Sequence, residues 1–169
     1  MEDCNLVSTP LDINQKLIKE THQRGKQETD YMKTVPYQEA IGSILYAAQV
    51  SRPDLSFAVG ALSRFNNNPS KSHWIAVKRL FRYIKGTINY KLEYNLDIEG
   101  CLEGFSDTDW DSDSDDRKST TGYLFKYQGG LISFNAKKQP TLALSTTEAE
   151  YKALASTSQE ALWLQSLLR

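Results

Sequence analysis

Apolar residues recur at helical spacing over the middle of the chain, from about residue 36 to residue 86. This pattern predicts three helices, at about residues 37–50, 53–65 and 70–85. Ser70 or Ser72 is placed to cap the third helix, and Gly86 to end it. Residues 1–34 are polar and aperiodic, which predicts a loose arm or linker.

The hydrophobic period changes after residue 90. Short strand candidates lie at residues 91–94, 102–107, 122–127, 131–135 and 140–144, and the third and fourth form a hairpin. A long helix then begins at Ser145, where Glu148 completes a capping box. On that helix Glu150 is in line with Leu154, Ala161 and other apolar positions, which predicts that it lies on the buried side. The element order predicts an α+β (α/β) chain with boundaries at 1–34, 35–95 and 96–169.

Charge is segregated along the 169 residues, although the net charge is only −1. Residues 55–92 contain seven basic and no acidic residues, and residues 93–116 contain ten acidic and no basic ones. This asymmetry indicates a surface for a polyanion beside a site for cations; the alternative is two solvated faces that neutralise each other. The candidate nucleic-acid-binding residues lie on the third predicted helix and are Lys78, Arg79, Arg82 and Lys85.

Composition excludes several classes of protein. The two cysteines, Cys4 and Cys101, form no disulfide or metal framework, so a reducing intracellular setting is expected. No apolar run is long enough to span a membrane, so no membrane partner is expected. His22 and His73 are isolated, which favours packing or capping over catalysis.

Two carboxylates are the candidates for chemistry. Asp107 ends an apolar strand and Glu150 lies on a core-facing helical stripe, where an unpaired charge is costly unless it binds a cation or donors. The alternatives are that Asp107 caps a turn and that Glu150 reaches solvent at the edge of its stripe. The acidic run at residues 107–115 does not fit a calcium loop, because it lacks the glycine and the closing glutamate. Residues 111–116 are therefore predicted to be a solvated loop.

Several motifs, in their order along the chain, resemble those of the C-terminal part of the Pol polyprotein of copia-type LTR retrotransposons. The resemblance covers nearly the whole chain. The motifs are residues 37–46, Ser51-Arg-Pro-Asp-Leu55, His73-Trp74, Arg82-Tyr-Ile-Lys-Gly-Thr87, Phe105-Ser-Asp-Thr-Asp-Trp110, Asp116-Arg-Lys-Ser-Thr-Thr-Gly-Tyr123, Lys137-Lys-Gln139 and Ala143-Leu-Ser-Thr-Thr-Glu-Ala-Glu-Tyr151.

This resemblance implies a helical thumb or connection unit of reverse transcriptase, followed by the first half of a ribonuclease H domain with an incomplete mixed sheet. The implied activity is hydrolysis of the RNA strand of RNA–DNA hybrids, with two Mg²⁺ (or Mn²⁺) ions. The family's first catalytic Asp matches Asp107 and its catalytic Glu matches Glu150, while Asp109 is a weak accessory candidate. The implied partners are the hybrid and the rest of the polyprotein, including the reverse transcriptase palm. The implied location is the cytoplasm, in virus-like particles, or the nucleus.

The family pattern also contains a third catalytic Asp, in an Asp-Asn motif after the long helix, which this sequence lacks. We therefore expect an enzyme by descent that is inactive, or nearly so, as this chain. Two alternatives stay open: a non-catalytic nucleic-acid-binding module, and a non-functional remnant of a decayed element.

Overall fold

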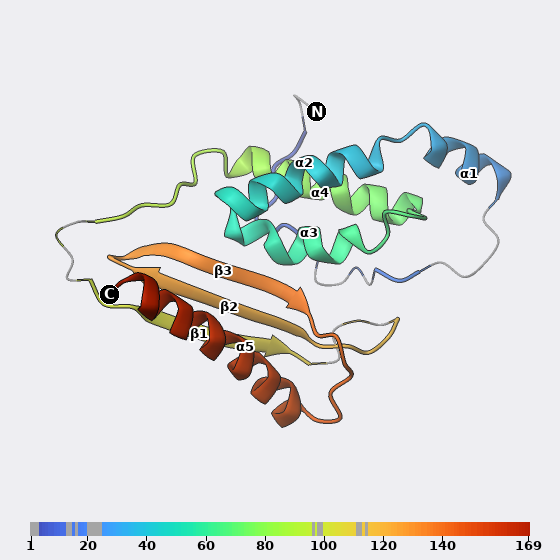
Figure 1. Cartoon of the computed structure of the whole chain (residues 1–169). Helices are drawn as coiled ribbons and strands as arrows, with labels where there is room; N and C mark the ends of the chain where they lie inside the picture. Colours follow the sequence, from blue (N-terminus) through green and yellow to red (C-terminus); the bar gives the residue numbers. More distant parts are fainter. Residues whose placement is uncertain are drawn as a thin grey trace. The chain divides into compact units, whose positions relative to one another are not determined.

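Two compact units, Met1–Tyr90 and Lys91–Arg169, make up the chain (Figure 1). The structure is a computed structural model, and it describes residues 4–12, 15, 17–19, 25–95, 97, 100–110, 113 and 115–169. Over these residues it contains five α-helices, one 3₁₀ helix and a three-stranded antiparallel sheet, which confirms the α+β class. None of the helices in these ranges has the length and apolarity that a bilayer crossing requires.

Helices form the whole of the first unit. Those at the predicted positions begin where their sequence signals lie: Pro53 opens a 3₁₀ turn, where its fixed φ is tolerated, and Ser70 caps the longest helix. The elements are α1 (Lys26–Lys33), α2 (Tyr37–Val50), η1 (Pro53–Leu55), α3 (Ser56–Ser63) and α4 (Lys71–Gly86).

The core of this unit lies among α2, α3 and α4, around Ile41, Leu62 and Leu80. His73 is fully buried and stacks on Phe65, with ring centroids 3.8 Å apart. Its Nδ1 accepts a hydrogen bond of 2.9 Å from the backbone N–H of Ser70. The prediction of packing or capping for this histidine is therefore confirmed; His22 lies outside the described residues.

The N-terminal residues are more ordered than their composition predicted. Residues 26–33 form α1, and the backbone carbonyl of Asn5 accepts a hydrogen bond of 2.5 Å from Arg82. Gln15 donates to the carbonyl of Ser72 at 3.2 Å. These polar contacts are made to α4, about 60 to 80 residues away in sequence, so no local pattern could reveal them.

The second unit is an antiparallel sheet with one long helix. Its elements are β1 (Glu103–Asp109), β2 (Thr120–Tyr127), β3 (Gly130–Lys138) and α5 (Thr146–Leu167). The strand order is β1-β2-β3, so β1 is an outer strand of the described sheet. The β2–β3 hairpin turns at Gln128 and Gly129, whose φ values of 50° and 73° match the left-handed turn that suits the twist of a hairpin.

Two predicted strands, at residues 91–94 and 140–144, are wrong. Residues 91–94 run without ladder pairing, and the hydroxyl of Tyr94 instead donates to the carbonyl of Leu131 at 2.7 Å. Pro140 lacks the N–H that a ladder needs. The carbonyl of Ala143 accepts from the indole of Trp110, and the N–H of Leu144 donates to Glu148. At Ala143 and Leu144, side chains thus make the backbone hydrogen bonds that a neighbouring strand would otherwise make.

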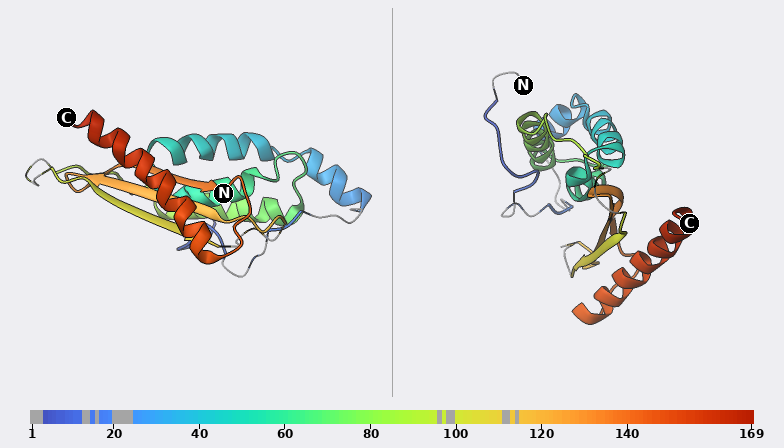
Figure 2. Two further views of the ribbon diagram at one scale, coloured as in Figure 1. Left: turned by 60° about the horizontal axis from the view of Figure 1, so that its bottom comes forward. Right: turned by 90° about the vertical axis from the view of Figure 1, so that its left-hand side faces the viewer.

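Helix α5 covers one face of the sheet, as both views of Figure 2 show. Its buried stripe is Ala149, Ala153, Thr157 and Leu164. The hydroxyl of Thr157 is hydrogen-bonded to that of Ser106 on β1, at 2.9 Å. The predicted stripe is confirmed at Thr157 and Leu164. It is wrong at Glu150 and Leu154, where the neighbouring alanines, Ala149 and Ala153, are buried instead.

Candidate functional site

Asp107 and Asp109 project from the same face of β1. Ser106 and Thr108 face α5, because Ser106 is bonded to Thr157 and the hydroxyl of Thr108 is reached by Gln139. Side chains alternate along a strand, so the two aspartates leave β1 on the opposite face.

The carboxylate of Asp107 turns toward the outer edge of β1. Its Oδ1 accepts a hydrogen bond of 2.9 Å from the backbone N–H of Thr108. An amide that donates to a side chain is not committed to the β1–β2 ladder, so it points away from β2. The carboxylate is exposed there. The alternative that Asp107 only caps a turn is weakened, because Asp107 lies within the strand and is paired opposite Gly122.

Asp109 lies close enough to Asp107 for their charges to interact. Burial, and secondarily the negative charge of Asp107, raise the pKa of the Asp109 carboxyl above its ordinary value. Two carboxylates that repel each other on one strand are a pair that a bound cation would stabilise.

At the start of α5 the predicted cap by Ser145 is confirmed, but the Glu148 side chain accepts from the N–H of Leu144 and not from that of Ser145, so the capping box is only half formed. Ser145 accepts a hydrogen bond of 3.1 Å from the N–H of Glu148, and the Glu148 carboxylate pairs with Lys152 at 2.7 Å. The hydrogen bond from Lys152, followed by that from the N–H of Leu144, lowers the pKa of Glu148. Glu148 therefore serves the helix start, and Glu150 is left for another role.

Glu150 is exposed, so its predicted burial is wrong and the alternative position at the edge of the stripe is correct. Its side of the helix can be assigned. Residues 152, 155, 156 and 159 face β3, because they line a cavity with residues of β3. At 100° per residue, Glu150 lies on the opposite flank from these positions, beyond the buried stripe. That flank lies toward the outer edge of β1.

Gln139 joins the neighbours of the two carboxylates. Its side-chain amide donates to the hydroxyl of Thr121 and to the carbonyl of Ala149, both at 3.0 Å, and more weakly to Thr108 at 3.4 Å. Thr108 and Ala149 directly adjoin Asp107 and Glu150. The buried amide of Gln139 therefore contacts a chain neighbour of each predicted site residue.

The donor set suits a hard divalent cation in part. Carboxylate oxygens are the ligands that Mg²⁺ prefers, and Asp107 and Glu150 both present them to solvent. Among the described residues, however, no group of three or more acidic, His or Cys side chains is gathered. Two carboxylates fit part of a two-ion site, whose remaining ligands must come from elsewhere.

The acidic segment after β1 is more structured than predicted. Asp113 is buried and pairs with Lys138, which also binds Asp116 at 2.7 Å. Burial opposes the charge on Lys138, but the hydrogen bonds that its ammonium donates to these two aspartates outweigh the burial and raise the pKa of Lys138. Residues 111, 112 and 114 lie outside the described ranges. The prediction of a solvated loop is wrong at Asp113, because a lysine on β3 satisfies it.

The four basic residues predicted to bind nucleic acid lie along α4. Lys78 and Lys85 are exposed. Arg79 contacts the N-terminal segment, with 2.9 Å to the hydroxyl of Thr9 and 3.5 Å to the carboxylate of Asp12. Arg82 is bonded to the same segment through Asn5. Arg79 and Arg82 are therefore bonded to the N-terminal segment of the chain.

Sequence reasoning missed Gln139 and Trp110 as members of this site. Both were within motifs of the family resemblance, Lys137-Lys-Gln139 and the segment ending at Trp110. Neither is ionisable, so no charge pattern singled them out. Gln139 contacts Ala149, and Trp110 contacts Ala143. Both contacts link the sheet to the start of α5.

Several curated proteins are similar to the chain, among them retrotransposon polyproteins. The chain is 45% identical over its whole length to a retrovirus-related Pol polyprotein from transposon TNT 1-94 of Nicotiana tabacum, and 39% identical over 96% of its length to the one from transposon RE1 of Arabidopsis thaliana. It spans only 13% and 11% of these polyproteins. It is also 51% identical over 133 residues to a secreted RxLR effector protein 161 of Plasmopara viticola, of which it covers 94%.

No protein-family profile matches the chain, and no solved structure matches it.

Proposed function

Because the chain belongs to the Pol polyprotein family of copia-type retrotransposons, we propose that its second unit supplies Asp107 and Glu150 to a ribonuclease H-type site. The substrate would be the RNA strand of an RNA–DNA hybrid. The placement of the two residues supports this proposal: Asp107 is exposed on β1, an outer strand of the described sheet, and Glu150 is exposed on the flank of α5 that faces away from β3.

Each carboxylate has a defined part in the proposal. Two Mg²⁺ (or Mn²⁺) ions, when bound, would supply an activated water and stabilise the leaving oxygen. Asp107 and Glu150 would hold the ions, and Asp109 is a possible accessory ligand. The exposure of both carboxylates leaves room for a phosphodiester to approach.

Further ligands would come from a longer polyprotein, since the relatives are many times longer than this chain. A two-ion site with only two protein carboxylates holds its ions weakly. Loss of part of a catalytic unit costs several orders of magnitude in rate. We therefore expect little or no cleavage by this chain alone, and cleavage by a polyprotein that contains it.

A cleavage assay tests the proposal. An RNA–DNA hybrid with labelled RNA is incubated with Mg²⁺ and either this chain or a longer polyprotein that contains it. We expect D107N and E150Q to reduce polyprotein cleavage by at least about 100-fold. The matched control is E148Q, two residues from Glu150 on the same helix, which should keep most of the activity. Cleavage that survives D107N or E150Q, or that E148Q abolishes equally, would contradict the assignment.

The second candidate function is non-catalytic binding of nucleic acid by α4. The exposure of Lys78 and Lys85, two helical turns apart on one face, favours it. The same hybrid, titrated without Mg²⁺, distinguishes this candidate. Binding that weakens steeply with salt, falls in the K78Q/K85Q double variant and survives D107N supports it.

A further inference from the structure

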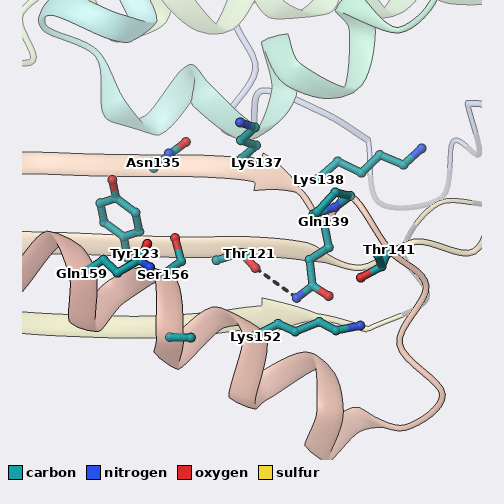
Figure 3. Close-up of a pocket in the computed structure, with 12 residues that line it drawn as sticks. Thr121, Tyr123, Asn135, Lys137, Lys138, Gln139, Thr141, Lys152, Ser156 and Gln159 are labelled. Atoms are coloured by element: carbon teal, nitrogen blue, oxygen red, sulfur yellow. Dashed lines mark hydrogen bonds between the residues drawn. The ribbon is translucent and has the colours of Figure 1, made fainter.

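A cavity of about 400 Å³ lies between α5 and the strands β2 and β3 (Figure 3). One wall is the Gln139 side chain, bonded to Thr121, and Figure 3 shows Lys137 and Lys152 on either side of it. The volume falls within the range of small-molecule sites in proteins. The cavity is on the α5 face of the sheet, whereas Asp107 leaves the sheet on the other face.

The residues that line this cavity include positively charged side chains but no negatively charged ones. Its twelve residues include Lys137, Lys138 and Lys152, and no aspartate or glutamate. The ammonium of Lys137 makes no hydrogen bond or ion pair within the part of the chain that the structure describes, and it is exposed.

Lys152 keeps capacity for a ligand. It binds Glu148 and the carbonyl of Leu142, at 2.7 and 3.0 Å, and an ammonium has three N–H donors, so one remains. Lys138 follows Lys137 on β3, so its side chain leaves the strand on the other face, where it binds Asp113 and Asp116. The cations available to a ligand in the cavity are therefore Lys137 and, with its charge partly offset by Glu148, Lys152.

Neutral polar groups complete the lining. Tyr123, Asn135 and Ser156 add hydroxyl and amide donors. The carbonyl oxygen of Gln139 is buried and has no donor among the described residues, although its amide nitrogen is fully used. A buried acceptor without a donor is rare in folded proteins and calls for a partner.

We propose that this cavity binds the phosphate of a nucleotide, either free or as part of a nucleic-acid strand. Donors and ammonium groups without a lining carboxylate suit phosphate oxygens. The cavity volume suits a ligand of nucleotide size. The site is separate from the proposed nuclease site and does not depend on it.

Calorimetric titration of the whole chain tests this proposal, with adenosine monophosphate, adenosine and a short single-stranded DNA as ligands. We expect binding of the monophosphate or the DNA, and much weaker binding of adenosine. K137Q should weaken that binding about tenfold, the effect of one charge-assisted hydrogen bond. Lys137 is exposed and unpaired, so the variant should fold normally, which circular dichroism verifies.

The matched control is K126Q, on β2 but outside the cavity lining, which should leave affinity unchanged. Binding of the monophosphate supports a free nucleotide, and binding of the DNA alone supports a strand phosphate. Absence of binding by both the monophosphate and the DNA, or equal losses in K137Q and K126Q, would overturn the proposal. D107N should leave the affinity unchanged, which separates a failure here from a failure of the nuclease assignment.

Discussion

At the scale of single residues, the two acidic motifs contain side chains with different roles. Glu148 and Glu150 are two residues apart, yet the first is bonded to the backbone and to Lys152, whereas the second is exposed on the β1 side of α5. Asp107 and Asp109 share a strand face; burial, and after it the negative charge of Asp107, raise the pKa of Asp109.

The pKa of Asp109 gives a prediction about its neighbour. D107N removes a nearby negative charge, so the pKa of Asp109 should fall, although burial should keep it above the ordinary value of an aspartate. Carbon-13 NMR titration of the Asp109 carboxyl measures this shift. The control E103Q, at the far end of β1, should leave it unchanged; an Asp109 pKa that D107N does not move would contradict the pairing.

The same shift affects stability, and its sign can be stated. The folded chain holds the Asp109 proton more tightly than the unfolded chain, because the folded pKa is the higher one. This contribution to stability is therefore present below the ordinary pKa of an aspartate. It is lost as the pH rises to the raised value.

At the scale of elements, Gln139 holds α5 on the sheet through two good hydrogen bonds, to Thr121 and to the carbonyl of Ala149. We expect Q139A to lower the free energy of unfolding by about 2 kcal/mol, because buried partners are left unsatisfied. Urea denaturation measures this. The control Q159A, at an exposed position of α5, should change it by less than about 0.5 kcal/mol; equal losses would show that Gln139 is not the link.

Helices α2 and α4 were predictable because apolar periodicity agreed with the boundary residues: α2 begins directly after Pro36, and α4 begins after Ser70 and ends at Gly86. The strands at residues 91–94 and 140–144 were wrong: the first makes no ladder, and in the second Trp110 bonds the carbonyl of Ala143 in place of a ladder. Burial on α5 was also mispredicted, because Ala149 and Ala153 pack on the sheet where larger residues were expected. Contacts distant in sequence decided each case.

The candidate site was only partly predictable. Asp107 and Glu150 were identified from charge, position and family resemblance. Gln139 was not, because its role depends on meeting Thr121 and Ala149 in the folded chain. Nor was the burial of Asp113 predicted, because it depends on the ion pair that Asp113 makes with Lys138 on β3.

At the scale of the whole molecule, the chain is a small part of a longer polyprotein in its transposon relatives. Two carboxylates at the outer edge of β1 suit a site that other segments complete. The same outer strand exposes Phe105 next to Leu124 on the face away from α5, a further surface with no cover among the described residues. Both features agree with function as part of a larger assembly.

The central claim is that Asp107 and Glu150 share a cation, and Mn²⁺ tests it on the chain as it is. Mn²⁺ broadens the NMR signals of nuclei close to its binding site. We expect amide signals at both residues 107 and 150 to broaden together, and D107N to remove the broadening at 150. Broadening at residue 150 that persists unchanged in D107N, or its absence at either residue, would contradict a shared site.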